Sequence, residues 1–177
     1  MHMTDIKAKR SVKWLTVTAV FTALNVVFSS FSVAVPGGHL YLNDIVICTA
    51  ALLFDPLAAF FVGGVGAFIG DLLFYPTTMF VSLVVRGLQA VVISLCAHYL
   101  MNAGGKRRIG AVIGLFLGAV IMVVGYSVAR AFIYATPEYA WLKLPWQIGM
   151  ALLGVIAAPV ISWSFGLEKL YRKMMQV

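Results

Sequence analysis

The apolar residues of this chain fall in long continuous runs, with little of the alternation that a barrel strand would require. A run of about 20 apolar residues can cross the hydrocarbon core of a bilayer, and an uninterrupted run favours a helix. Reading the runs between charged residues, prolines and glycines predicts six membrane-spanning helices. Their approximate bounds are 14–32, 43–55, 57–75, 80–101, 109–135 and 145–167. The second is short, and Asp55-Pro56 breaks it from the third because proline lacks a backbone donor.

Composition supports a membrane location for the whole chain. Of its 177 residues, 62% are hydrophobic and 11% are charged, which is far from the balance of an ordinary soluble domain. We therefore expect one all-α integral membrane domain over residues 1–177, built as a six-helix bundle. Cys48 and Cys96 lie inside apolar runs without the paired spacing of a disulfide or metal site, so we expect small core residues and no metal or cofactor.

The positions of the basic residues predict the orientation of the helices. Most of the 13 Lys and Arg residues form three clusters. These are Lys7, Lys9, Arg10 and Lys13; Lys106, Arg107 and Arg108; and Lys169, Arg172 and Lys173. The positive-inside rule places all three in the cytoplasm, which requires even numbers of crossings between them and predicts cytoplasmic N- and C-termini. This rim, suited to anionic lipid headgroups, explains the net charge of +7 without any nucleic acid partner.

Three basic residues lie outside these clusters, namely Arg86, Arg130 and Lys143. A charge within a span is costly and is by default a functional hypothesis. At about 1.5 Å per residue, Arg86, Arg130 and Asp71 lie roughly 6–9 Å below the outer ends of their helices. Asp44 begins the second helix on the same side. Charged residues at one depth on several helices predict a polar pocket that opens outward.

The charge balance of this pocket leaves two interpretations open. Two basic and two acidic groups would make it nearly neutral, which favours an uncharged ligand. Alternatively, Asp71 pairs with Arg86 and Asp44 pairs with Arg130 as buried structural salt bridges.

Other polar and aromatic residues lie at the same outer level. Gln89 follows Arg86 by three residues and Tyr126 precedes Arg130 by four, so each pair shares a helix face. The outer segments also contain Tyr41, Tyr75, Tyr134, Tyr139, Trp141 and Trp146, with Gln147 beside the last. Such rings either form an interfacial belt or line a site for a planar heterocycle. The stretch 33–42, which contains His39, is apolar but rich in turn residues and predicts a lid over the pocket.

Sequence motifs for catalysis and nucleotide binding are missing. Gly104-Gly105-Lys106 is followed by Arg107 and lacks the other residues of a phosphate-binding loop, so the chain cannot power uphill transport alone. Gly-x-Ser-x-Gly and His-Glu-x-x-His are also missing, and His39 and His98 are expected at opposite membrane faces. We therefore expect no catalytic residues and no enzyme activity.

Small residues at intervals of four predict close helix packing. Gly110, Gly114 and Gly118 form one such stripe on the fifth helix, and Gly66 and Gly70 form another on the third. Ala19 and Ala23 form a shorter one on the first helix. Stripes of this kind let helix backbones approach closely in lipid, and internal packing is the simplest interpretation.

The stretch from Gly38 to Leu73 resembles the substrate-binding S components of energy-coupling factor (ECF) vitamin transporters, especially the riboflavin-transporter-like branch. It reads Gly-His-Leu-Tyr-Leu-Asn-Asp-Ile-Val, then Leu-Leu-Phe-Asp-Pro-Leu-Ala, then Gly-Gly-Val-Gly-Ala-Phe-Ile-Gly-Asp-Leu-Leu. The length, the six spans and the Ala19-x-x-x-Ala23 stripe are also similar, so the resemblance covers nearly the whole chain.

This resemblance implies a multi-pass protein of the bacterial cell membrane that captures a small vitamin or precursor for uptake. A transmembrane coupling protein and two cytoplasmic ATPases would drive release, and Ala19 and Ala23 would contact the coupling protein. The resemblance and the pocket argument together assign substrate binding to Arg86, Gln89, Tyr126, Arg130, Trp146, Gln147, His39, Tyr41, Asp71 and Asp44. Hydroxymethylpyrimidine or pyridoxine is favoured as ligand, and riboflavin is possible. A noncatalytic membrane scaffold of the cell-shape type is the alternative, although it would not require charged residues at one depth.

Overall fold

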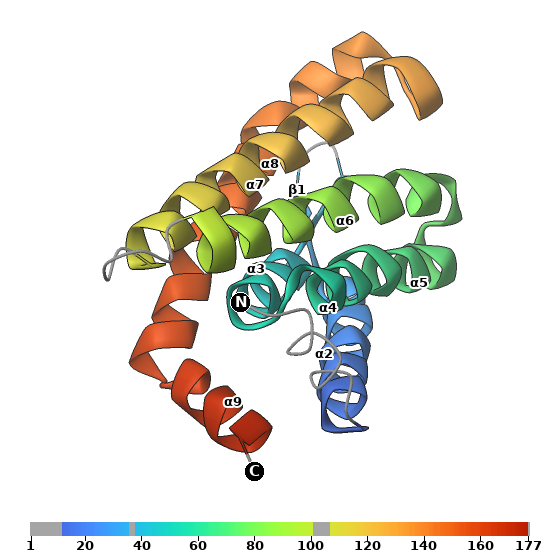
Figure 1. The fold of residues 1–177 in the computed structure, drawn as a ribbon. Helices are drawn as coiled ribbons and strands as arrows, with labels where there is room; N and C mark the ends of the chain where they lie inside the picture. Colours follow the sequence, from blue (N-terminus) through green and yellow to red (C-terminus); the bar gives the residue numbers. More distant parts are fainter. Residues whose placement is uncertain (1–11, 36–37, 101–106, 177) are drawn as a thin grey trace.

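The structure is a computed structural model that describes residues 12–35, 38–100 and 107–176 (Figure 1). Its α-helices are α2 (Val12–Ser30), α3 (Asn43–Leu53), α4 (Pro56–Phe60), α5 (Gly66–Phe74), α6 (Met79–Leu95), α7 (Arg107–Ala129), α8 (Pro137–Pro159) and α9 (Leu167–Gln176). The π-helical segment η1 (Phe61–Val65) joins α4 to α5. Three more, η3 (Cys96–Leu100), η4 (Arg130–Tyr134) and η5 (Val160–Ser164), continue α6, α7 and α8, and η2 (Pro76–Thr78) is a 3-10 turn before α6.

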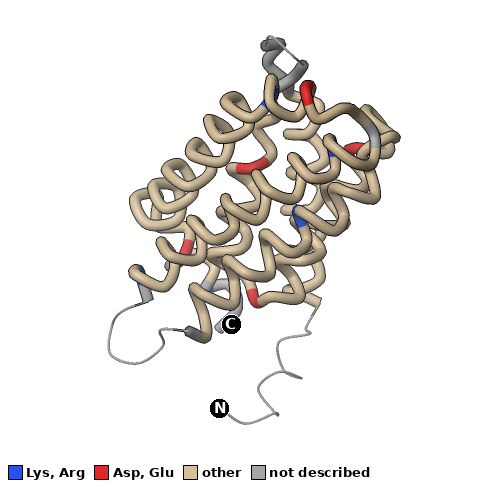
Figure 2. Tube along the Cα trace, turned by 90° about the horizontal axis from the view of Figure 1, so that it is seen from above, with Lys and Arg blue, Asp and Glu red and all other residues tan. Residues whose placement is uncertain are grey.

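Within these described ranges, five helical rods are long and apolar enough to cross a membrane. They are Val12–Ser30, Pro56–Phe74, Pro76–Tyr99, Arg108–Ile133 and Pro137–Ser164. Charged positions are few along the tube in Figure 2. The remaining predicted span corresponds to α3, an apolar helix of 11 residues. Multi-pass membrane insertion is therefore supported, whereas the count of six spans and the cytoplasmic side of the termini stay predictions.

The short helix α3 forms the centre of the bundle. Ten of its 11 residues are buried, and it packs against α8, α6 and α2 (Figure 1). Its cluster of buried side chains includes Ile47, Cys48 and Ala51, which pack with Ile93 of α6. Cys48 and Cys96 are both free and buried. Beyond Asn43 and Asp44 of its first turn, α3 is largely apolar on every side, which is the pattern of a helix buried among others.

The turn between α3 and α4 lies at the same end of the bundle as the start of α2 and helix α9. Trp14 Nε1 donates a hydrogen bond to Asp55 Oδ1 at 2.7 Å, and the rings of Phe54 and Tyr171 lie 5.0 Å apart. A small cavity of about 260 Å³ at this end is lined by Leu53, Arg108 and Glu168 among others. The described members of the three basic clusters therefore lie at one end of the molecule, as even numbers of crossings require.

The segment after α2 is a β-hairpin, which the all-α prediction did not include. Strands β1 (Ser32–Val35) and β2 (Gly38–Tyr41) are antiparallel, with Ser32 opposite Tyr41 and Val35 opposite Gly38. The β-branched Val33 and Val35 favour strands on either side of the turn signal Pro36-Gly37, which lies outside the described residues. Strand β2 packs against α8. The predicted lid segment is therefore largely extended, and the side chain of His39 lies outside the described ones.

Helix α8 begins earlier than the predicted span at residue 145. Thr136 is the N-cap and its hydroxyl accepts a hydrogen bond from the Tyr139 backbone N–H at 3.4 Å, while Pro137 and Glu138 occupy the first turn. This order of residues is the usual signal for a helix start. Pro145 lies within the helix and does not end it. The prediction followed Pro145 and therefore missed about two turns of helix.

Glycines allow several helices to touch along their backbones. A Cβ atom added at Gly63 would lie 2.9 Å from the carbonyl oxygen of Arg86 and 2.7 Å from the Cβ of Ala90. Gly64 and Gly87 meet beside this contact, so η1 and α6 cross with almost no side chain between them. The predicted stripes behave in the same way: Gly114 and Gly118 pack on α6, and Gly66 and Gly70 pack on α2.

The variant Gly63→Ala should lower the free energy of unfolding by about 1–3 kcal/mol, because its methyl group meets a backbone oxygen that cannot turn away. Gly149→Ala is the matched control, since a Cβ at Gly149 has no atom within 4 Å. Thermal unfolding of the two purified variants in detergent measures the difference. Equal unfolding temperatures would contradict the tight crossing of η1 and α6.

Candidate ligand-binding site

A cavity of about 600 Å³ opens at the end of the bundle opposite the basic clusters. Its wall comes from β2, the start of α3, the end of α5, the first half of α6, the second half of α7 with η4, and the first half of α8. This volume lies within the range of pockets that hold small organic ligands. Seven of the residues predicted for substrate binding line it, namely Tyr41, Asp71, Arg86, Tyr126, Arg130, Trp146 and Gln147.

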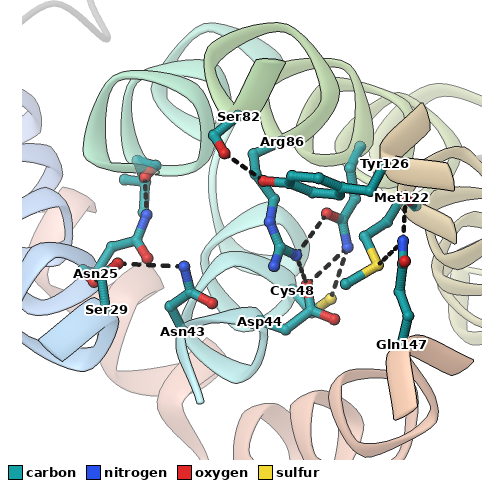
Figure 3. Close-up of polar contacts among 12 residues, drawn as sticks. Asn25, Ser29, Asn43, Asp44, Cys48, Ser82, Arg86, Met122, Tyr126 and Gln147 are labelled. Carbon is teal, nitrogen blue, oxygen red and sulfur yellow. Dashed lines mark hydrogen bonds and ion pairs between the residues drawn. The ribbon is translucent and has the colours of Figure 1, made fainter. Parts of the chain in front are cut away.

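The floor of the cavity rests on a buried ion pair between Arg86 of α6 and Asp44 of α3. Arg86 Nη1 donates to Asp44 Oδ1 (Figure 3) and, at 3.1 Å, to Gln89 Oε1. Gln89 Nε2 donates to the same Asp44 oxygen at 2.9 Å. The three side chains therefore bond to one another, although Asp44 Oδ2 and Arg86 Nε have no hydrogen-bond partner among the described residues. Asp44 and Gln89 do not line the cavity and instead hold Arg86 from behind.

The pairing that the sequence suggested for the two carboxylates is wrong. Asp44 pairs with Arg86 and not with Arg130, and Asp71 pairs with neither arginine. Depth along a helix cannot show which helices are neighbours. Asp44 meets Arg86 because α3 packs between α6 and α8, so its first turn faces α6. That first turn also favours a negative charge, since the N-terminal end of a helix carries partial positive charge.

Asp71 is held at the cavity wall by hydroxyl groups. Thr78 Oγ1 and Ser82 Oγ donate to its Oδ2 atom at 2.7 and 2.5 Å. The Ser82 oxygen also lies 2.5 Å from the Tyr126 hydroxyl (Figure 3). Because a serine hydroxyl has one proton, Tyr126 donates to Ser82 when Ser82 donates to Asp71. A chain of hydrogen bonds therefore links the carboxylate of α5 to the aromatic ring on α7.

Tyr126 also contacts both arginines of the cavity. The guanidinium carbons of Arg86 and Arg130 lie 5.3 and 5.6 Å from the centre of its ring, which is cation–π distance. Arg130 donates to Gln147 Oε1, and Gln147 Nε2 donates to the carbonyl oxygens of Met122 and Val123 at 3.0 and 3.2 Å. Gln147 thus ties α8 to α7 while it orients Arg130 toward the cavity.

Aromatic rings complete the wall. The rings of Tyr41 and Tyr75 pack edge to face with centres 5.2 Å apart. Burial, together with a hydrogen bond to Tyr75, raises the pKa of Tyr41 well above its ordinary value, so this hydroxyl stays protonated at physiological pH. Tyr139 and Trp146 of α8 are partly exposed at the rim.

Sequence reasoning left Lys143 out of the site. It lines the cavity, and its Nζ atom lies 5.9 Å from the centre of the Tyr139 ring. The predicted start of the last span at residue 145 placed Lys143 beyond the helix. The Thr136-Pro137-Glu138 signal would have extended the helix and brought Lys143 and Tyr139 into the wall.

The predicted neutrality of the pocket is also wrong. Arg86, Arg130, Lys143 and Asp71 line the cavity, while Asp44 lies behind it and neutralises Arg86. When Asp44 is included, three cations face two anions. The site therefore carries one net positive charge.

The alanine stripe of α2 lies away from the cavity and is not covered by the other described residues. Ala19 and Ala23 are exposed, whereas Thr18, Asn25 and Ser29 on the opposite face are buried. Asn25 Nδ2 donates to the carbonyl oxygen of Val62 at 2.6 Å, which directs that face toward η1. The expectation that the stripe packs within the chain is therefore wrong. Its role as an interface stays a prediction.

Similarity to known proteins extends over most of the chain. Residues 9–171 match the family described as "ECF-type riboflavin transporter, S component". A protein of Pyrococcus woesei, described as "Uncharacterized protein in gap 3'region", is 34% identical over 126 residues. That match covers 70% of this chain and 81% of the relative.

The variant Asp44→Ala should lose about 3–5 kcal/mol of stability, because it leaves the Arg86 charge buried without a partner. The double variant Asp44→Ala with Arg86→Met should recover most of this loss, since no charge then remains buried. Chemical or thermal unfolding in detergent compares the two. A double variant no more stable than the single variant would show that the ion pair is not what holds α3 against α6.

Proposed function

The chain belongs to the family of S components of ECF-type riboflavin transporters, and from this premise we propose that it is the substrate-binding subunit of an ECF-type importer. In this role it captures a small vitamin or vitamin precursor for uptake and performs no chemistry on it. It acts as a multi-pass protein of the cell membrane, in which the five long helical rods and α3 form a single domain with both termini in the cytoplasm.

The observation that carries this proposal is the polar cavity within an otherwise apolar bundle. Charged side chains in a membrane-spanning helix cost several kcal/mol unless they face a cavity or one another. Four charged residues from α5, α6, η4 and α8 line one space of about 600 Å³ together with several aromatic rings. A noncatalytic membrane scaffold does not require charged residues around a cavity. A binding subunit needs it, because rings and donors together recognise a planar heterocycle.

The family description names riboflavin, and the cavity volume leaves room for a ligand of that size. Hydroxymethylpyrimidine and pyridoxine are smaller planar heterocycles that the same walls would also accept. Binding is proposed through Arg86, Tyr126, Arg130, Trp146, Gln147, Tyr41 and Asp71 at the wall, with Asp44 and Gln89 as positioning residues for Arg86. His39 is proposed from its place on β2 beside Tyr41.

The partners proposed for this subunit are a transmembrane coupling protein and two cytoplasmic ATPases, which would supply the energy for release. The exposed Ala19 and Ala23 face of α2 is proposed as the contact with the coupling protein. Its opposite face is already occupied by η1 and α5, so this side remains for another helix. Alanine leaves only a methyl group there, which permits a close approach of the partner.

The isolated chain should bind its ligand without nucleotide, because the binding groups belong to this subunit. Isothermal titration of the detergent-purified chain with riboflavin, pyridoxine and hydroxymethylpyrimidine measures this. The double variant Arg86→Met with Asp44→Ala is the matched control. It should still fold, but it lacks the Arg86 guanidinium at the cavity, so ligand binding should weaken. Binding that appeared only with ATPase subunits and ATP present would contradict the capture model.

Ala19→Arg should abolish co-purification with the coupling protein while ligand affinity changes less than about two-fold, because a guanidinium on the exposed face holds a partner helix away. Val120→Arg, on an exposed part of α7, controls for a charge introduced on the lipid-facing surface. Titration and pull-down of both variants separate the two effects. Intact co-purification with weakened ligand binding would reject α2 as the docking helix.

A further inference from the structure

Two cations of the cavity have no carboxylate partner among the described residues. At the cavity, the described ion pair is Arg86–Asp44, and the described residues include every acidic residue of the chain except Asp5. Asp55 and Glu168 lie at the opposite end of the bundle, and Glu138 is exposed and does not line the cavity. Arg130 and Lys143 therefore face the cavity with their charges uncompensated.

The unpaired cations lie on one side of the cavity. Arg130 belongs to η4 and bonds to Gln147 of α8, and Lys143 lies four residues before Gln147 on the same helix. One N–H group of Arg130 is donated to Gln147. A guanidinium has five such groups and an ammonium has three, so several donors remain for a ligand.

On the opposite side of the cavity, both charged side chains already have partners. Asp71 of α5 is already bonded by Thr78 and Ser82, and Arg86 is neutralised by Asp44. The ring of Tyr126 lies between these two sides, since both Arg86 and Arg130 contact it. An anionic group would therefore bind at Arg130 and Lys143, with its ring against Tyr126, Tyr139 or Trp146.

We infer that the ligand of this cavity is a planar aromatic or heteroaromatic acid that carries a single carboxylate. This inference rests on the proposed capture function, but it assigns an acid as the substrate in place of the three uncharged candidates named above. An uncharged ligand would leave two cations desolvated and unpaired when it filled the cavity, which is costly in a low-dielectric surrounding. A phosphate dianion would exceed the single net positive charge of the site and repel Asp71. One carboxylate balances the site and suits the charge-assisted donors of Arg130.

Matched ligand pairs test the inference on the detergent-purified full chain. Nicotinate against nicotinamide compares a carboxylate with its neutral amide, and riboflavin 5′-phosphate against riboflavin compares a phosphate with its neutral parent. Isothermal titration should show nicotinate binding at least about ten-fold tighter than nicotinamide, since a charged hydrogen-bonded partner is worth more than a neutral one. The preference should fall below about two-fold in Lys143→Gln and Arg130→Gln. It should persist in Lys13→Gln, which removes a cation at the far end of α2.

Mass spectrometry of small molecules released by denaturing the purified chain decides the case independently of the probes. A released aromatic carboxylate is the expected result. A released molecule that is uncharged at neutral pH, or tighter binding of the neutral member of each pair, overturns the inference while capture stands. Tighter binding of the phosphate than of both the carboxylate and the neutral ligands rejects the proposal that the ligand carries a carboxylate. If nothing is released and no probe binds, both the capture function and the inference fail.

Discussion

The buried ion pair between Arg86 and Asp44 is the constraint on which the rest of this structure depends. A guanidinium within an apolar bundle must find an anion, and the first turn of α3 supplies one where the helix end already favours negative charge. Gln89 completes the arrangement by bonding to both groups. This requirement brings α3 against α6 and keeps a short helix at the centre of much longer ones.

The cavity forms directly above this pair, between the outer parts of α5, α6, α7 and α8. Gly63, Gly64 and Gly87 press η1 against α6 on one side, and Gly114 and Gly118 press α7 against α6 on the other. The outer halves of α6, α7 and α8 carry larger polar and aromatic side chains, which enclose a space and do not fill it. Close backbone contacts between helices therefore lie below the cavity, and larger polar and aromatic side chains line it.

This division of the molecule matches what a capture subunit requires. The charged wall lies at the end opposite the basic clusters, so the cavity and the basic end are separated by the length of the bundle. The exposed alanine face of α2 runs along the outside and shares no residue with the cavity. The proposed binding and docking faces could therefore change independently, which is the arrangement expected when a different subunit supplies the energy.

The sequence by itself determined the membrane class, most helix positions, the family resemblance and most of the charged wall residues. Hydropathy and the cost of buried charge are local properties, so Arg86, Arg130 and Asp71 could be singled out without coordinates. Only the tertiary structure decided which charges meet, because helix neighbours depend on packing between distant segments. It paired Asp44 with Arg86, turned the Ala19 stripe outward and brought Lys143 into the wall through the early start of α8. The addition of Lys143 changes the site from a neutral pocket to one with a net positive charge.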